Sequence, residues 1–342
     1  MYVRIRSGRR VDRRKLIIDA DPGIDDAVAI MLANGSHVFD ILGITAVYGS
    51  ASLNQTARNT LYLADLYDIG CKVAIGAKQA ILKSIPFDET PNGKNGLGNY
   101  VYPQLGRKPY DRWAWELIYE AALECEGELE ILTLGPLTNI AIAVLRYPLL
   151  KDLVKRIVIM GGSSEIGDVS PYAEFNMMQD AHAASIVMEA GFHDLVMVDL
   201  MSCMTAYLTD IEADRFLIQK SKLGPLYETM RRYQRKVFRD YLEEFPLAGE
   251  YLAERNVFCG AVAAAVAVDQ SISAVEPCYV AVETRSAVNY GQTIIDRHGR
   301  FNKRANVSLA AGADRNSFYT MLFNALDSYL PDSGAEKGEE NG

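Results

Sequence analysis

The cysteines of this sequence form no pattern that binds a metal or builds a disulfide framework. They are scattered, odd in number and contain no CxxC pair: Cys71, Cys125, Cys203, Cys259 and Cys278. The four histidines, at positions 37, 182, 193 and 298, also lack the spacing of metal ligands. We therefore expect neither a zinc cluster nor a disulfide scaffold, and free thiols are typical of the reducing cytoplasm.

Long apolar runs and surplus positive charge are also absent. No stretch approaches the length of a transmembrane helix. The 35 basic and 44 acidic residues give a net charge of −9, which argues against a nucleic-acid surface. Basic residues cluster over positions 4–15, but Asp19 follows after only three apolar residues, too few for a signal peptide. The expectation is a cytoplasmic protein with no membrane or nucleic-acid partner.

Strand-like apolar runs alternate with helical periodicity along most of the 342 residues. The pattern predicts strands over 16–19, 41–47, 72–75, 129–134, 156–160, 195–199 and 278–283. It predicts helices over 24–34, 53–67, 112–124, 139–145 and 180–189. This alternation is typical of an α/β domain with a mostly parallel central sheet and helices on both faces. No GxGxxG follows a predicted strand, which argues against dinucleotide binding.

We expect one domain over 15–330, preceded by a basic arm over 1–14 and followed by a polar, disordered tail over 331–342. Two segments interrupt the alternation. Residues 85–103 are rich in Pro, Gly and Asn and are predicted to form a long loop, either a functional lid or disordered. Residues 225–245 are predicted to form a charged helix whose aromatic side chains pack on the core in preference to stacking on a nucleobase.

The most informative feature is a strand-to-helix junction that carries four aspartates. Asp19, Asp21, Asp25 and Asp26 fall within eight residues, after the apolar run 16–18 and before an apolar helix face. Four carboxylates repel one another, so we expect a positive group to neutralise them, and a hard divalent cation is the simplest candidate. A solvated acidic turn, or carboxylates placed at a helix N-terminus, would explain one or two of them.

This junction has the form DxDPGxDD, and further motifs follow it along the chain. They are LGPLTNIA over 134–141, MGG over 160–162 and AEFN over 173–176. Together they resemble the inosine–uridine-preferring nucleoside hydrolases, and the resemblance extends over roughly residues 15–270. It implies a single α/β domain, a homodimer or homotetramer, bound Ca²⁺, and hydrolysis of the N-ribosidic bond of a nucleoside or related ribosyl compound.

The resemblance also implies a role for each matching residue. Asp21 would be both a calcium ligand and the general base that activates water. Asp26 and the backbone carbonyl of Leu134 would complete the protein ligands, and Asp19 would support the turn. The substrate-binding residues would be Asp25 and Asn176 at the ribose hydroxyls, Glu174 at the 5′ end of the sugar, and Met160.

Several positions depart from the family pattern. Ser50 stands where the family has Asn, Asn92 replaces a His of the lid, and Asp168 replaces an Asn near the 5′ end. In the segment 258–265, Cys259–Gly260 replaces a His-Asp pair. Gly260 has no carboxylate, so we expect weakened calcium binding. Cys259 stands near the leaving base, although a buried small hydrophobe is the simpler interpretation of this thiol.

Two hypotheses of different classes therefore follow. The first is a metal-assisted N-glycosidase with an altered substrate and a weakened metal site. The second is a catalytically impaired relative that binds a ribosyl ligand or a protein partner. A phosphotransferase of the DxDx type fits less well, because the Pro-Gly-x-Asp-Asp continuation does not match that pattern.

Overall fold

The computed structural model describes residues 13–86, 91–218, 221–244 and 255–330. Their strands form one sheet in the order β3-β2-β1-β4-β5-β6-β9-β7-β8. The bounds are β1 Arg14–Ala20, β2 Phe39–Ala46, β3 Lys72–Ile75, β4 Leu129–Thr133, β5 Val154–Met160, β6 Leu195–Val198, β7 Val275–Val282, β8 Thr293–Asp296 and β9 Val307–Ala310. All pairs are parallel except those of β7 with β8 and β9. The predicted α/β class and mostly parallel sheet are confirmed.

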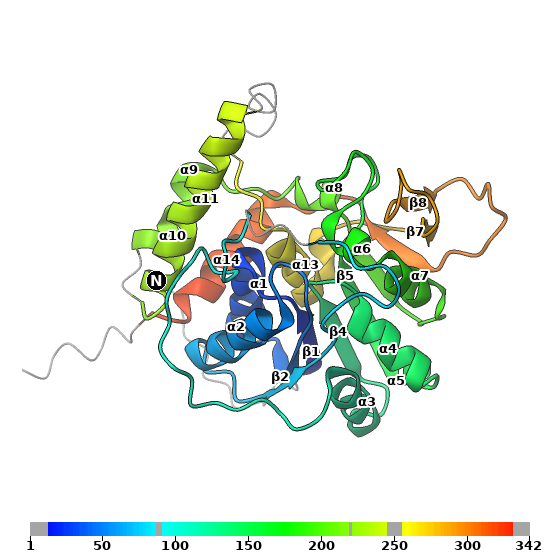
Figure 1. Cartoon of the computed structure of the whole chain (residues 1–342), viewed down its shortest axis with the longest axis horizontal. Coiled ribbons are helices and arrows are strands. Elements are labelled where there is room, and N and C mark those ends of the chain that lie inside the picture. Colours follow the sequence, from blue (N-terminus) through cyan, green and yellow to red (C-terminus); the bar gives the residue numbers. More distant parts are fainter. Residues whose placement is uncertain (1–12, 87–90, 219–220, 245–254, 331–342) are drawn as a thin grey trace, which may run out of the picture.

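Helices cover both faces of the sheet (Figure 1). On one face lie α1 Ile24–Gly35, α2 Leu53–Leu66, α13 Cys259–Val268 and α14 Arg315–Asp327. On the other lie α3 Ala114–Glu124, α4 Thr138–Arg146, α5 Leu150–Leu153 and α7 Ala181–Glu189. Strand β1 shows why its sequence is continuously apolar: Leu16 and Ile18 belong to one core cluster and Ile17 to the other. Side chains alternate along a strand, so a strand buried on both faces needs apolar residues at every position.

The strand order places a topological switch beside β1. From β1 the chain proceeds outward to β2 and β3, and then returns to the other side of β1 with β4. In sheets of this kind the loops after the two strands at the switch diverge, and a crevice opens between them. The acidic turn follows β1 directly, so the fold puts the aspartates at the mouth of this crevice.

Arg14 belongs to the sheet, although we expected it in the basic arm over 1–14. It is the first residue of β1, and its Nε donates to the buried Glu130 at 2.8 Å. Its guanidinium also donates to the carbonyl oxygens of Ala267 and Val268 at the C-terminal end of α13. A cation is favoured at that end of a helix. The rest of the predicted arm over 1–12 and the predicted tail over 331–342 lie outside the described residues.

The predicted loop over 85–103, whose residues 87–90 are not described, is fastened to the acidic turn. Asn59 on α2 donates to the carbonyl oxygens of Pro22 and Asn95, both at 2.8 Å. Asn92 accepts a hydrogen bond from the backbone N–H of Ile24 at 3.0 Å, and so caps α1 from outside the helix. The loop and the turn are therefore one connected unit.

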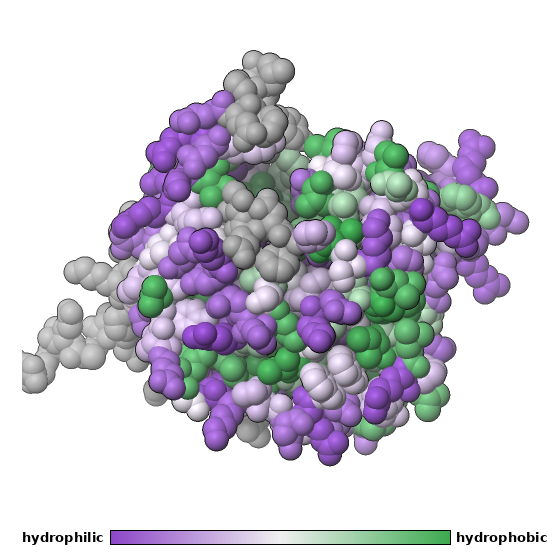
Figure 2. All heavy atoms as spheres, viewed as in Figure 1, coloured by the Kyte–Doolittle hydropathy of each residue, from purple (hydrophilic) through white to green (hydrophobic). Residues whose placement is uncertain are grey.

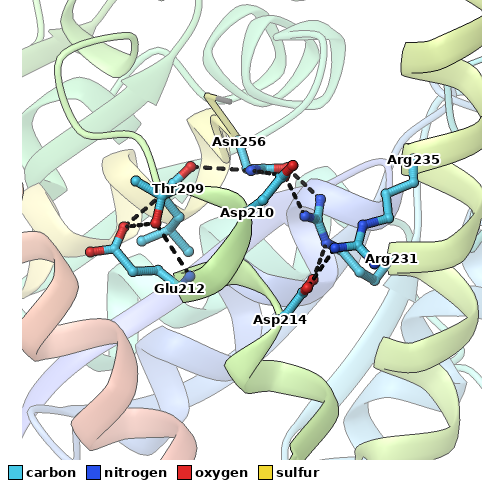
Figure 3. A network of polar contacts seen from close by, with 8 residues as sticks. Thr209, Asp210, Glu212, Asp214, Arg231, Arg235 and Asn256 are labelled. Carbon is cyan, nitrogen blue, oxygen red and sulfur yellow. Dashed lines mark hydrogen bonds and ion pairs between the residues drawn. The ribbon is translucent and has the colours of Figure 1, made fainter. Parts of the chain in front are cut away.

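The charged helix expected over 225–245 is α11 Gly224–Glu244, which projects from the edge of the molecule in Figure 1. The prediction that its aromatic residues pack on the core is correct for Tyr227, which is buried, and wrong for Tyr241, which is exposed. Arg231 is nearly buried and holds the helix in place (Figure 3). It pairs with Asp210 at 2.6 Å and Asp214 at 3.1 Å, and it donates to Asn256. Asn256 leads into α13, so this network links α11 to the segment that enters the crevice.

Several short elements make up the rest of the described residues. They are the short helices α6 Phe175–Gln179, α8 Leu200–Cys203, α9 Asp210–Ala213, α10 Arg215–Ile218 and the 3₁₀ turn η2 Gln270–Ile272. No helix in the described parts of the chain is long and apolar enough to cross a membrane.

Candidate active site

The loops after β2, β1, β4 and β5 surround a cleft of about 680 Å³. Parallel strands end at the same edge of a sheet, so residues far apart in sequence meet there. All the residues expected to bind metal or substrate line this one cleft: Asp21, Asp25, Asp26, Ser50, Asn92, Leu134, Met160, Asp168, Glu174, Asn176 and Cys259. Their individual roles stay predictions, but their convergence is a property of the fold.

Asp21 is held at the floor of the cleft between two glycines. A Cβ added at Gly49 would lie 2.2 Å from its Oδ2, and one added at Gly135 would lie 2.4 Å from its Oδ1. The backbone N–H of Ser50 donates to Asp21 Oδ2 at 2.5 Å, and the Ser50 hydroxyl donates to the Asp21 carbonyl. Ser50, expected to bind substrate, therefore also orients the Asp21 carboxylate. The close approach of two backbones fixes this side chain in one position.

Replacing Gly135 by Ala is expected to displace the Asp21 carboxylate and to lower kcat by at least about 100-fold, since a misplacement of about 1 Å has that effect in other active sites. The measurement is the initial catalytic rate of the purified variant at saturating substrate. Gly70→Ala is the matched control, because a Cβ at Gly70 meets no atom within 4 Å. Equal rates for the two variants would contradict the clamp described here.

Asp25 and Asp26 face the start of α13. The backbone N–H of Gly260 donates to Asp25 Oδ2 at 2.7 Å, across 235 positions of sequence. A Cβ at Gly260 would lie 3.3 Å from Asp26 Oδ1 and 3.4 Å from Asp25 Oδ2. Two oxygens, Asp25 Oδ1 and Asp26 Oδ2, are buried without a hydrogen-bond partner. The absent side chain at Gly260 therefore leaves a gap beside the carboxylates of Asp25 and Asp26, each of which has one buried oxygen without a partner.

Glu174 is the N-cap of the short helix α6, and Asn176 lies in its first turn. Glu174 caps the helix by accepting from the backbone N–H groups of Asn176, Gly162 and Met177 at 2.9, 2.8 and 3.2 Å. The side-chain amide of Asn176 donates to the Leu134 carbonyl at 2.7 Å. Glu174 thus shapes the loop after β5, and Asn176 contacts the carbonyl that was expected to bind metal.

Asp168 and Phe175 lie together at the mouth of the cleft. Asp168 is exposed, and its Oδ1 accepts from the backbone N–H of Phe175 at 2.9 Å. Sequence reasoning missed Phe175 and Gln179 as lining residues. Gln179 is buried and its Oε1 has no partner in the structure. The available signal was their position in α6: Phe175 lies between the two residues that the motif identified, and Gln179 follows it by four positions, on the same side of the helix.

Burial dominates the electrostatics of the cleft floor. It raises the pKa of Asp21 to about 8 and that of Asp25 to about 7. It raises the pKa of Asp26 well above its ordinary value, and the charges of Asp21 and Asp25 add to the effect. Burial and the charge of Asp168 raise the pKa of Glu174 to about 8. Without a bound cation, these carboxyl groups keep their protons to a higher pH than carboxyl groups in water do.

Stability should therefore fall as the pH rises when divalent cations are absent. The folded state holds protons on these carboxyl groups up to about pH 7–8, whereas the unfolded state releases them near its ordinary pKa of 3.8. Because the folded state then binds more protons, the free energy of unfolding decreases as pH rises through that interval. We expect a loss of at least about 2 kcal/mol between about pH 5.5 and pH 8.5, measured by urea denaturation.

Added calcium should offset that loss at the higher pH, because it binds the ionised folded state. The variant Asp25→Asn should show a shallower pH dependence, while the surface variant Asp111→Asn should keep the wild-type slope. A wild-type stability that rises from pH 5.5 to 8.5 without added cations would contradict the interpretation.

These features define an α/β enzyme with a carboxylate-lined cleft for a small ligand. The chain belongs to the inosine-uridine preferring nucleoside hydrolase family, whose model matches residues 16–320. It is similar to the pyrimidine-specific ribonucleoside hydrolase RihB of Escherichia coli strain UMN026, with 30% identity over 94% of this chain and 99% of the relative. Enzymes of this kind hydrolyse N-ribosidic bonds, and the chain is such a hydrolase.

Solved structures of nucleoside hydrolases are similar to this chain over most of its length. A plant nucleoside hydrolase has a TM-score of 0.82 and 28% identity, over 93% of this chain and 99% of its own. The purine-preferring ribonucleoside hydrolase from Gardnerella vaginalis has a TM-score of 0.83 and 28% identity, over 92% and 99%. The predicted family and fold are confirmed.

The family is generally metal dependent, so the donor set of the cleft matters. In the described part of the chain, no three His, Cys, Asp or Glu side chains are arranged as a metal cluster. The cleft instead offers the carboxylates of Asp21 and Asp26 and the carbonyl of Leu134. These are hard oxygen donors, and the unpartnered Asp26 Oδ2 points to a missing positive partner. The residues therefore fit a hard divalent cation, with fewer carboxylates than a strong calcium site has.

Proposed function

We propose that this chain hydrolyses the N-ribosidic bond of a ribonucleoside or related riboside in the cleft described above, with Asp21 as the general base. The observation that carries the proposal is the position of Asp21. It lies at the cleft floor, clamped between Gly49 and Gly135 and aimed by Ser50. Burial raises the pKa of Asp21, which makes its carboxylate, once ionised, a stronger base than a carboxylate in water.

The other polar groups of the cleft bind different parts of the ribose. Asp25 and Asn176 bind its hydroxyls, and Glu174 with Asp168 faces the 5′ end. The carboxylates around the ring stabilise the positive charge that develops on the sugar as the base leaves. Met160 packs against this part of the cleft, and Asn92 and Cys259 lie toward the departing base.

Asp21, Asp26 and the Leu134 carbonyl would hold a Ca²⁺ ion. When bound, such an ion supplies Lewis acidity that lowers the pKa of a neighbouring water. Asp21 takes the proton, and Ser50 keeps the carboxylate aligned for that transfer.

The test is an assay of the purified full chain with calcium and a panel of purine and pyrimidine nucleosides, in which free ribose and free base are both measured. We expect turnover that disappears when the cation is chelated and returns when it is added back. Asp21→Ala is the control. No turnover above that control for any riboside would overturn the proposal.

One observation favours a second function. Position 260 has no carboxylate beside Asp25 and Asp26, and its loss is expected to weaken both cation and ribose binding, as in a relative that binds a ribosyl ligand or a protein partner without cleaving it. Calorimetry that shows ribose or nucleoside binding in the absence of hydrolysis would support it, and measurable turnover would exclude it.

The assembly and location are part of the proposal. We propose a homodimer or homotetramer, built from one domain over 15–330, in the cytoplasm. The five cysteines are free, which is in keeping with a reducing compartment. Light scattering after size-exclusion chromatography measures the assembly, and a monomer at micromolar concentration would contradict it.

A further inference from the structure

The outward sides of α3 and α4 carry large apolar side chains in contact with solvent. Leu123 on α3 is 51% exposed, Leu145 on α4 is 60% exposed, and Leu149, which follows α4, is 64% exposed. Trp113, the N-cap of α3, is 53% exposed. Figure 2 shows hydrophobic side chains gathered over the part of the molecule where Figure 1 places α3, α4 and α5. Burial of this apolar surface against a partner would be favourable, and an exposed patch of this kind marks an interaction site.

Contacts between the two helices make these side chains one continuous face. The rings of Tyr119 and Tyr147 stack with their centroids 4.0 Å apart, and so join α3 to the end of α4. Arg146 lies over the Tyr147 ring and pairs with Glu116 at 3.8 Å. Leu123 lies one helical turn beyond Tyr119, on the same side of α3. We call this surface the α3–α4 face, and it consists of Trp113, Trp115, Glu116, Tyr119, Leu123, Leu145, Arg146, Tyr147 and Leu149.

The α3–α4 face has the composition of the centre of a protein interface. Tryptophan, tyrosine and arginine are enriched among the residues that contribute most to protein association, and this face contains all three. The indole rings of Trp113 and Trp115 stack with their centroids 5.4 Å apart. Rings that are already stacked lose little side-chain entropy when a partner covers them. The face is therefore arranged to bind another protein surface.

The charges of the face favour a second copy of this chain as that partner. Glu116 and Arg146 carry opposite charges and lie side by side, with apolar side chains before and after them on both helices. In a two-fold symmetric dimer the same patch faces itself, so it must be complementary to itself. A two-fold axis through the face brings Glu116 of each copy toward Arg146 of the other, while the leucines and aromatic rings meet around them.

We propose that two copies of this chain form a homodimer through the α3–α4 face. This inference rests on the assembly put forward under the proposed function, and it names the surface that forms the dimer. None of the described residues that line the cleft belongs to this face. Substitutions on the face therefore test the assembly separately from catalysis.

The first test is sedimentation velocity of the full chain over a range of protein concentrations. Leu145→Glu is expected to raise the dimer Kd by at least about 30-fold, as the loss of a central interface residue does. Ile211→Glu is the matched control, because Ile211 is an apolar residue that is 83% exposed and lies on α9, far from α3 and α4 in Figure 1. We expect this control to dimerise like the wild type.

The second test exchanges the charges of the face. In a homodimer of Glu116→Arg, positive charges face each other, and in a homodimer of Arg146→Glu, negative charges do. Each variant alone is expected to be mostly monomeric at a concentration at which the wild type is dimeric. An equimolar mixture is expected to form a heterodimer at least about 10-fold tighter than either homodimer, because unlike charges then meet across the axis.

This mixture also separates the contact between copies from the ion pair within one copy. Every chain in the mixture carries two like charges at positions 116 and 146, so only pairing between chains can restore the dimer. An unfolded variant could not restore it, and circular dichroism of each variant checks the fold directly.

The outcomes distinguish the face from the rest of the proposal. A wild-type chain that stays monomeric would overturn both the proposed assembly and this face, and would leave the face to a different partner. A wild-type dimer that Leu145→Glu and Ile211→Glu leave equally intact would overturn the face alone, and so would a mixture of the charge variants that stays monomeric. The hydrolase function is measured independently, by ribose release from the same preparations.

Discussion

The variant Asp21→Asn is expected to lose at least about 10³-fold in kcat, within the range that general bases contribute. Asn keeps the size of the side chain and the position between Gly49 and Gly135, but it cannot accept a proton from water. It also removes one of the two carboxylates available to a cation. The measurement is the steady-state rate of ribose release at saturating substrate and calcium.

Asp19→Asn is the matched control for this prediction. Asp19 lies two residues earlier, on β1, and is buried, but it does not line the cleft. Its carboxylate accepts from Asn139 at 2.7 Å and from Thr45, so it fastens the turn to α4 and β2. Its loss should lower stability more than kcat. If Asp19→Asn and Asp21→Asn reduce kcat alike, the assignment of Asp21 as base fails.

Much of this site followed from the sequence because of a simple physical constraint. A strand buried on both faces reads as an apolar run, so residues 16–18 marked β1. The polar residues that follow such a strand must then lie at the common carboxyl edge of the parallel sheet. The motifs with Leu134, Met160 and Asn176 lie after or near other strand ends. The alternation of apolar strands with helices therefore predicted where most of the cleft residues lie.

Other features had no local signal. Strands β8 and β9 have four residues each, and α14 lies beyond the last predicted element. Strands β3 and β6 are equally short and were predicted, over 72–75 and 195–199, whereas β8 and β9 were not. The clamp of Gly49 and Gly135 on Asp21 is likewise invisible in sequence, because it depends on the close approach of three chain segments.

At position 260 the sequence identifies which residue is present, whereas the structure shows which side chains surround it. The family resemblance indicated that a carboxylate is missing there. Only the structure shows that the gap faces Asp25 and Asp26, and that the Gly260 backbone N–H still binds Asp25. The neighbourhood of the lost side chain is intact.

Restoring the acid by Gly260→Asp is therefore expected to strengthen divalent-cation binding by about 10- to 100-fold, since affinity follows ligand charge and number. The substitution adds a carboxylate beside Asp26, in the first turn of α13, where the helix dipole favours an anion. Its Cβ would lie 3.3 Å from Asp26 Oδ1, so neighbouring atoms must shift by a few tenths of an ångström. Calorimetric titration with calcium measures the change.

Gly260→Asn separates charge from size, because it introduces the same volume without a carboxylate. In calcium-free buffer, Gly260→Asp should be less stable than Gly260→Asn, since it places a third acid beside Asp25 and Asp26. Calcium should reverse that order, because the cation binds only the folded arrangement of carboxylates. Equal calcium affinity for the two variants would show that position 260 does not face the cation, and that Asp21 and Asp26 alone set the affinity of this site.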